Sequence, residues 1–99
     1  MNMNRNNINE IVIGEISAIN ADGEQRFVGK LRNCQACVWG TKHFYILQSY
    51  GTMVAAIDKE SNIMFDFLRY VYGYTATSAQ HIAKFAIDYG ATSRYTYRP

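Results

Sequence analysis

Short runs of apolar and β-branched residues fill the first third of the chain, and their pattern predicts strands. Residues 11–20 and residues 25–32 are two such runs, rich in Ile, Val and Phe. Asp22 and Gly23 lie between them, and Asp-Gly between β-type runs is a strong hairpin signal. The sequence therefore predicts an antiparallel pair of strands at the start of the domain.

Three further β-type runs follow in the middle of the chain. Residues 42–50 are β-branched and aromatic, Gly51 interrupts the run, and residues 52–58 continue as another strand. Residues 63–74 form the next run after a short polar turn. Connections of hairpin length favour neighbouring antiparallel strands, so we expect an antiparallel sheet of four to five strands.

The pattern changes to a helical one at Thr77. Thr77 and Gln80 have the spacing of a capping box, and Gly90 is placed to end the helix. Residues 93–99 could return as a short edge strand. The apolar positions of the helix recur every three or four residues: Ala79, Ile82, Ala83, Phe85, Ala86 and Tyr89. The predicted fold class is α+β, with the antiparallel sheet packed against one C-terminal helix.

Length and composition indicate a single globular domain. A chain of 99 residues is too short for two cores, and 48% hydrophobic with 18% charged residues is globular composition. Residues 1–7 are polar and aperiodic, which predicts a disordered lead-in before a domain over residues 8–99. No apolar run approaches the roughly 20 residues that span a bilayer, and the N-terminus lacks a signal-peptide pattern. We expect a cytosolic protein with no membrane partner.

The charge balance of the chain does not identify the type of binding partner. Ten basic and eight acidic residues give a formal net charge of +2, and both signs are spread evenly over the two halves of the chain. Nucleic acid is permitted by this balance but not indicated. The usual phosphate-loop, dinucleotide, metalloprotease and serine-hydrolase motifs are absent, so we expect a protein that is not an enzyme.

The segment around the two cysteines is the strongest candidate for a metal site. Cys34 and Cys37 have the Cys-x-x-Cys spacing of half a zinc site, and His43 and His81 are the two histidines of the chain. In a reducing compartment such a pair binds metal more often than it forms a disulfide. These four residues predict one structural Zn²⁺ that would tie the central hairpin to the start of the helix.

Two other interpretations of the cysteines stay open. Free cysteines are often small buried apolar residues, and Cys37 with Trp39 suits one face of a strand. A thiolate–imidazole pair for catalysis would need a third, orienting group that the sequence does not indicate.

Tyrosine and arginine are concentrated in two short segments, residues 69–74 and 94–98. Tyrosine occurs there at every second position, which would place the tyrosines of each segment on one face of a strand. Tyr and Arg are frequent in binding hot spots and also stack on unpaired bases. The alternative is that the tyrosines only cover the rim of a small core. The predicted partner-binding residues are Arg69, Tyr70, Tyr72, Tyr74, Arg94, Tyr95, Tyr97 and Arg98.

The segment from Tyr72 to Phe85, "YGYTATSAQHIAKF", places a Tyr-x-Tyr-Thr turn before a capped helix. With its short, Asn-rich and Ile-rich chain, the protein resembles the small accessory proteins of phages and mobile elements of Gram-positive bacteria. That group includes anti-CRISPR proteins that act on type II CRISPR nucleases. The resemblance implies an inhibitor that binds a CRISPR nuclease complex without catalysis; the alternative is a small nucleic-acid-binding module that uses the Tyr/Arg strands.

Overall fold

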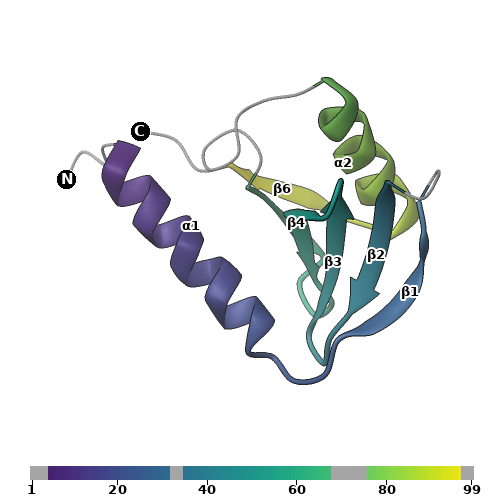
Figure 1. The fold of residues 1–99 in the computed structure, drawn as a ribbon, viewed down its shortest axis with the longest axis horizontal. Helices are drawn as coiled ribbons and strands as arrows, with labels where there is room; N and C mark the ends of the chain where they lie inside the picture. The colour runs from purple at the N-terminus through teal and green to yellow at the C-terminus, as the bar shows by residue number, and fades with distance from the viewer. Residues whose placement is uncertain (1–4, 32–34, 68–75, 97–99) are drawn as a thin grey trace.

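The computed structural model describes residues 5–31, 35–67 and 76–96, which form two helices and one sheet (Figure 1). In chain order the elements are α1 (Arg5–Asn20), β1 (Arg26–Lys30), β2 (Ala36–Gly40), β3 (Phe44–Ser49), β4 (Thr52–Asp58), β5 (Ile63–Asp66), α2 (Ala76–Asp88) and β6 (Ser93–Thr96). The predicted α+β class with a helix near the C-terminus is confirmed. Neither α1 nor α2 is long and apolar enough to cross a membrane.

The six strands lie in the sheet in the order in which they occur along the chain. Strands β1 to β5 are antiparallel to their neighbours, as predicted, but β6 pairs with β5 in parallel. The parallel pair forms because α2 carries the chain from the end of β5 back to the end where β5 began. The sheet is therefore mixed and has six strands, one more than the upper number expected, and β6 is the predicted edge strand.

Helix α1 replaces a predicted strand. The hairpin over residues 11–20 and 25–32 is wrong in its first half, since residues 5–20 are helical and β1 alone is extended. The buried or half-buried positions Val12, Ile16 and Ile19 are spaced i, i+4 and i+7, which is the period of a helix and not of a strand. The helix also begins at Arg5, inside the segment predicted to precede the domain.

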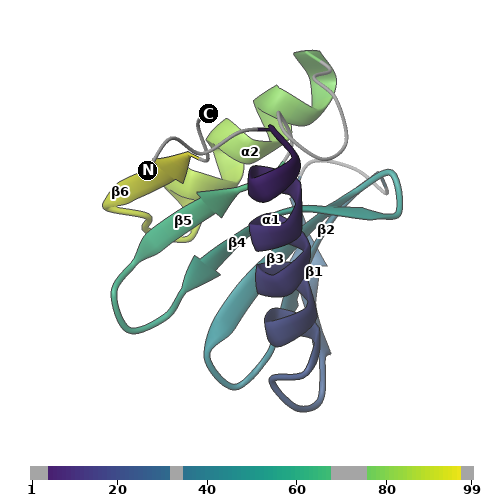
Figure 2. The same ribbon diagram turned by 90° about the vertical axis from the view of Figure 1, so that its left-hand side faces the viewer.

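The two helices cover opposite faces of the sheet (Figure 2). The α2 face holds the larger cluster of buried apolar residues, and the α1 face holds a smaller cluster surrounded by half-buried aromatic rings. The α2-face cluster consists of Leu31, Ala36, Val38, Leu47, Val54, Ala55, Ile57, Met64, Ile82 and Phe85. The α1-face cluster consists of Val12, Ile19, Ile46, Ala56 and Phe67.

Glycines end two elements as the sequence predicts. Gly90 has φ +74°, its N–H donates to the Ile87 carbonyl at 3.4 Å, and the Ala91 N–H donates to the Ala86 carbonyl at 2.9 Å. This pair of bonds is a Schellman cap. Between β3 and β4, Tyr50 and Gly51 both have positive φ, +51° and +80°, as a two-residue type I′ hairpin requires.

Candidate functional site

Two of the predicted zinc ligands, Cys37 and His81, lie on different faces of the sheet. Cys37 shares a face with Trp39 two residues later on β2, and the Trp39 Nε1–H donates to Gln48 Oε1 at 3.1 Å on the α1 face. His81 belongs to α2, and its Nδ1 lies 3.0 Å from Ser49 Oγ on the other face. The sheet therefore stands between Cys37 and His81.

His43 is separated from His81 along the sheet. It precedes β3, whereas Ser49 beside His81 ends that strand, so about 20 Å of extended chain lies between the two sites. Cys34 lies outside the described residues. Within residues 5–31, 35–67 and 76–96 no three Cys, His, Asp or Glu side chains are grouped as metal ligands. The described part of the chain does not support one ion bound by all four residues.

His81 instead takes part in a buried polar cluster between β3 and α2. Ser49 Oγ lies 3.0 Å from Ser78 Oγ and 3.0 Å from His81 Nδ1. All three side chains are buried, and the Tyr50 ring lies beside the imidazole, with ring centroids 6.0 Å apart. A Ser–His contact is the geometry of an activated nucleophile, but burial keeps this one from a substrate. The cluster fits the role of a polar tie between helix and sheet.

His43 belongs to a second polar cluster, which Asp22 forms at the turn between β2 and β3. The Asp22 carboxylate accepts from Thr41 Oγ1 at 2.7 Å and from the His43 N–H at 2.7 Å, and it lies 2.6 Å from His43 Nδ1. The hydrogen bond from the His43 side chain, and then that from Thr41, lower the pKa of Asp22 to about 2. Thr41 and His43 both contact the Asp22 carboxylate, so Asp22 caps the turn between β2 and β3.

Only part of the predicted Tyr/Arg surface lies within the described residues. Arg94 and Tyr95 are exposed on β6, and the Tyr95 ring lies against Phe65 with centroids 5.8 Å apart. This pair faces the side of the sheet that α1 covers. The remaining predicted residues fall outside the described part of the chain: Arg69, Tyr70, Tyr72, Tyr74, Tyr97 and Arg98.

Strand β1 carries the most exposed apolar surface of the sheet. Phe27 is 52% exposed and Val28 is 47% exposed, and no residue of β1 is buried. The Phe27 ring is held edge-on against Trp39, with centroids 5.4 Å apart. Arg26 and Lys30 flank this apolar pair and are also exposed. We call residues 26–30 together with Trp39 the β1 surface.

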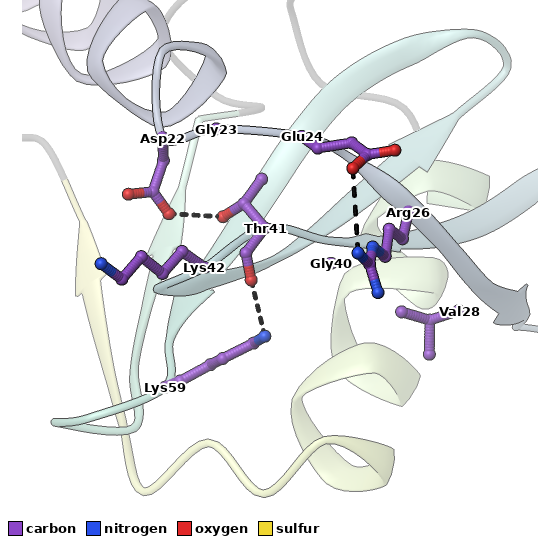
Figure 3. Close-up of a pocket in the computed structure, with 9 residues that line it drawn as sticks. All are labelled: Asp22, Gly23, Glu24, Arg26, Val28, Gly40, Thr41, Lys42 and Lys59. Carbon is purple, nitrogen blue, oxygen red and sulfur yellow. Dashed lines mark hydrogen bonds and ion pairs between the residues drawn. The ribbon is translucent and has the colours of Figure 1, made fainter.

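A groove of about 550 Å³ adjoins the β1 surface at the turn between β2 and β3 (Figure 3). Its walls come from the α1–β1 connection, from β1, from the end of β2 and from the β4–β5 connection. The lining residues are Asp22, Gly23, Glu24, Arg26, Val28, Gly40, Thr41, Lys42 and Lys59. The Lys59 ammonium donates to the Thr41 carbonyl at 2.7 Å and lies 4.8 Å from the centroid of the Tyr45 ring.

Sequence reasoning missed both the β1 surface and the groove. The available signal was the adjacent pair Phe27 and Val28, because neighbouring residues of a strand point to opposite faces and one of the two must leave the core of a half-covered strand. The structure also shows a bulge between Phe27 and Gly29, which places Val28 outside the regular pairing with β2. The groove had no local signal, since its lining residues come from three separate segments, 22–28, 40–42 and residue 59.

Comparison with protein-family models, with curated proteins and with solved structures finds no match to this chain.

Proposed function

We propose that the protein is a non-catalytic inhibitor of the phage counter-defence type, which binds a type II CRISPR nuclease complex in the host cytosol and blocks its action. The observation that supports a binding role is the β1 surface. An aromatic anchor flanked by arginine and lysine has the composition of a binding hot spot. The Trp39 contact holds the Phe27 ring in place before binding, which lowers the entropy lost on association.

The buried position of the Ser49–His81 contact supports a role without catalysis. Both side chains are at most 3% exposed, as Ser49 is 2% and His81 is 3% exposed. A nucleophile and its base must reach the substrate, and here they tie α2 to β3 instead.

A cleavage assay tests the proposal. The purified protein is added at an equimolar ratio to guide-loaded type II CRISPR nucleases, and cleavage of a matched DNA target is measured. We expect inhibition of at least one such nuclease, with complex formation on a sizing column. Unchanged cleavage and no complex with a broad set of type II nucleases would rule out these nucleases as the target.

Two matched variants connect the inhibition to the β1 surface. Phe27→Ala should weaken binding by about 1–4 kcal/mol, as truncation of a hot-spot residue does. Ile87→Ala is the control, because Ile87 is 80% exposed and belongs to α2 and not to β1. Equal affinities of the two variants would mean that binding and inhibition do not depend on the β1 surface.

A nucleic-acid-binding module is the second candidate, favoured by Arg94 and the Phe65–Tyr95 ring pair on β5 and β6. Aromatic rings exposed on a sheet can stack on unpaired bases, and basic residues of the same strand can contact phosphates. Binding through phosphates would make log affinity fall linearly with log salt, whereas a hydrophobic protein contact changes little with salt. Affinity for a single-stranded oligonucleotide measured over a salt series therefore separates the two functions.

A further inference from the structure

The groove beside β1 combines positive charge with an apolar wall. Arg26, Lys42 and Lys59 line it, and Val28 forms part of its wall. Figure 3 shows Arg26 and Val28 on one side of Gly40 and Lys59 on the other. An ammonium has three N–H donors, and the Thr41 carbonyl accepts one of those of Lys59. The groove thus presents N–H donors next to apolar surface.

The two carboxylates of the groove differ in how far they offset this charge. Asp22 is turned to the β2–β3 turn, where both of its oxygens are within hydrogen-bond distance of Thr41 or His43. Glu24 pairs with Arg26 at 3.8 Å, with both side chains about four-fifths exposed, at 78% and 82%. Such an exposed pair contributes little, so an incoming anion can take the place of Glu24.

Gly40 keeps the floor of the groove open. A Cβ atom at this position would lie 3.2 Å from Val28 Cγ2 and 3.9 Å from Lys59 Nζ. Any larger side chain at residue 40 would therefore occupy the space between the apolar wall and the ammonium. The absence of a side chain here leaves room for a small group of a ligand.

We propose that this groove binds the carboxylate of an acidic segment of the protein partner, while an apolar neighbour of that carboxylate packs on Val28. The inference rests on the proposed function and names the partner chemistry that the β1 surface recognises. A protein segment fits better than a nucleic-acid backbone, because Asp22 and Glu24 on the rim would repel a continuous row of phosphates. One carboxylate carries a single charge and meets less of that repulsion, and its apolar neighbour can contact the Val28 wall.

A peptide titration followed by the backbone amide signals of the ¹⁵N-labelled protein tests the inference. The probe is a capped hexapeptide of alternating leucine and aspartate, and its matched control has asparagine in place of aspartate. We expect saturable shifts at residues 26–28 and 40–42, and affinity for the asparagine peptide lower by about threefold or more. The same titration with a single-stranded oligo-dT represents the nucleic-acid source of an anion.

Two pairs of variants examine charge and space separately. Arg26→Gln should weaken binding of the aspartate peptide by about threefold, whereas Arg94→Gln on β6 should leave it unchanged. Gly40→Ala should weaken it by narrowing the floor, whereas Gly14→Ala should not, since a Cβ at Gly14 meets nothing within 4 Å.

Several results would overturn the inference: no saturable shifts at residues 26–28 and 40–42, equal affinity for the two peptides, or equal effects within either pair of variants. Tighter binding of oligo-dT in the groove would reassign it to phosphate. Failure of the proposed target is distinguishable, because the peptide would then still bind the groove while CRISPR nucleases are not inhibited. Inhibition that depends on Phe27 but not on Arg26 would contradict the role of the groove and leave the proposed function unaffected.

Discussion

The centre of the sheet and its edge strand β1 use their side chains in different ways. Each strand from β2 to β5 buries residues under one of the helices, and β4 buries Val54, Ala55, Ala56 and Ile57 in succession. Strand β1 buries none, and its Phe27 and Val28 remain about half exposed. Apolar area that stays in water adds little to stability. The centre therefore supplies most of the burial that stabilises the fold, whereas the apolar area of β1 stays accessible.

The largest effect should come from truncation in the centre, and it should be larger under α2 than under α1. Ile82 on α2 and Ile19 on α1 are each 1% exposed, so Ile→Ala is a matched change on the two faces. We expect Ile82→Ala to cost about 3–5 kcal/mol and Ile19→Ala about 2–3 kcal/mol, because the smaller α1-face cluster can relax into the cavity. Urea unfolding of both variants measures this difference. A larger cost for Ile19→Ala would reverse the ranking of the two faces.

The next effect concerns the buried polar tie between β3 and α2. Ser49→Ala removes the hydroxyl that contacts Ser78 and His81, and each of these buried groups loses one partner. We expect a loss of about 1–3 kcal/mol in the free energy of unfolding. Ser93→Ala on the exposed β6 is the matched control and should change stability by less than about 0.5 kcal/mol. Equal effects of the two variants would mean that the tie contributes nothing.

A smaller effect, confined to acid, should come from Asp22. Its pKa is about 2 in the folded protein, below the ordinary value of 3.8, so folding favours the ionised carboxylate. The resulting stability is present above pH 3.8 and is lost as the pH falls toward 2. Asp22→Asn cannot titrate, so between about pH 4 and 2 its stability should fall less steeply than that of the wild type. Parallel curves of melting temperature against pH would contradict this assignment.

The smallest effect should come from Cys37, a half-buried thiol on the α1 face. Because the sheet separates it from His81, we expect Cys37→Ser to cost about 0.5–1 kcal/mol and chelation to leave the melting temperature unchanged. Loss of a ligand of a structural zinc ion would cost far more. Elemental analysis of protein purified without a histidine tag is the direct check, and a full equivalent of zinc would restore the site predicted from the sequence.

Local sequence patterns predicted an element correctly where its segment carried a single structural signal. The helix near the C-terminus was predicted from its apolar period and Gly90, and the β3–β4 hairpin from Gly51. Residues 11–20 were misassigned because β-branched Ile and Val favour strands, while the spacing of Val12, Ile16 and Ile19 favours a helix. Packing against the sheet decided between these two signals.

The candidate site was harder to predict because it depends on which face each side chain takes. Cys37 and His81 were suitable as ligands by residue type, and only the pairing of Cys37 with Gln48 and of His81 with Ser49 places them on opposite faces. The groove requires three separate segments to meet, which no local pattern encodes. The exposure of Phe27 likewise follows from the position of β1 at the edge of the sheet.

Hydrogen exchange of the protein, free and bound to the nuclease complex proposed as its target, tests most directly whether β1 is the contact surface. The account predicts slower exchange on binding at residues 26–30 and 40–42, with unchanged rates at residues 83–88 on α2. Residue 87 serves as the internal reference, since its side chain is exposed and belongs to α2. Unchanged rates at residues 26–30, together with slower exchange at residues 93–96, would contradict the account and place the contact on β6.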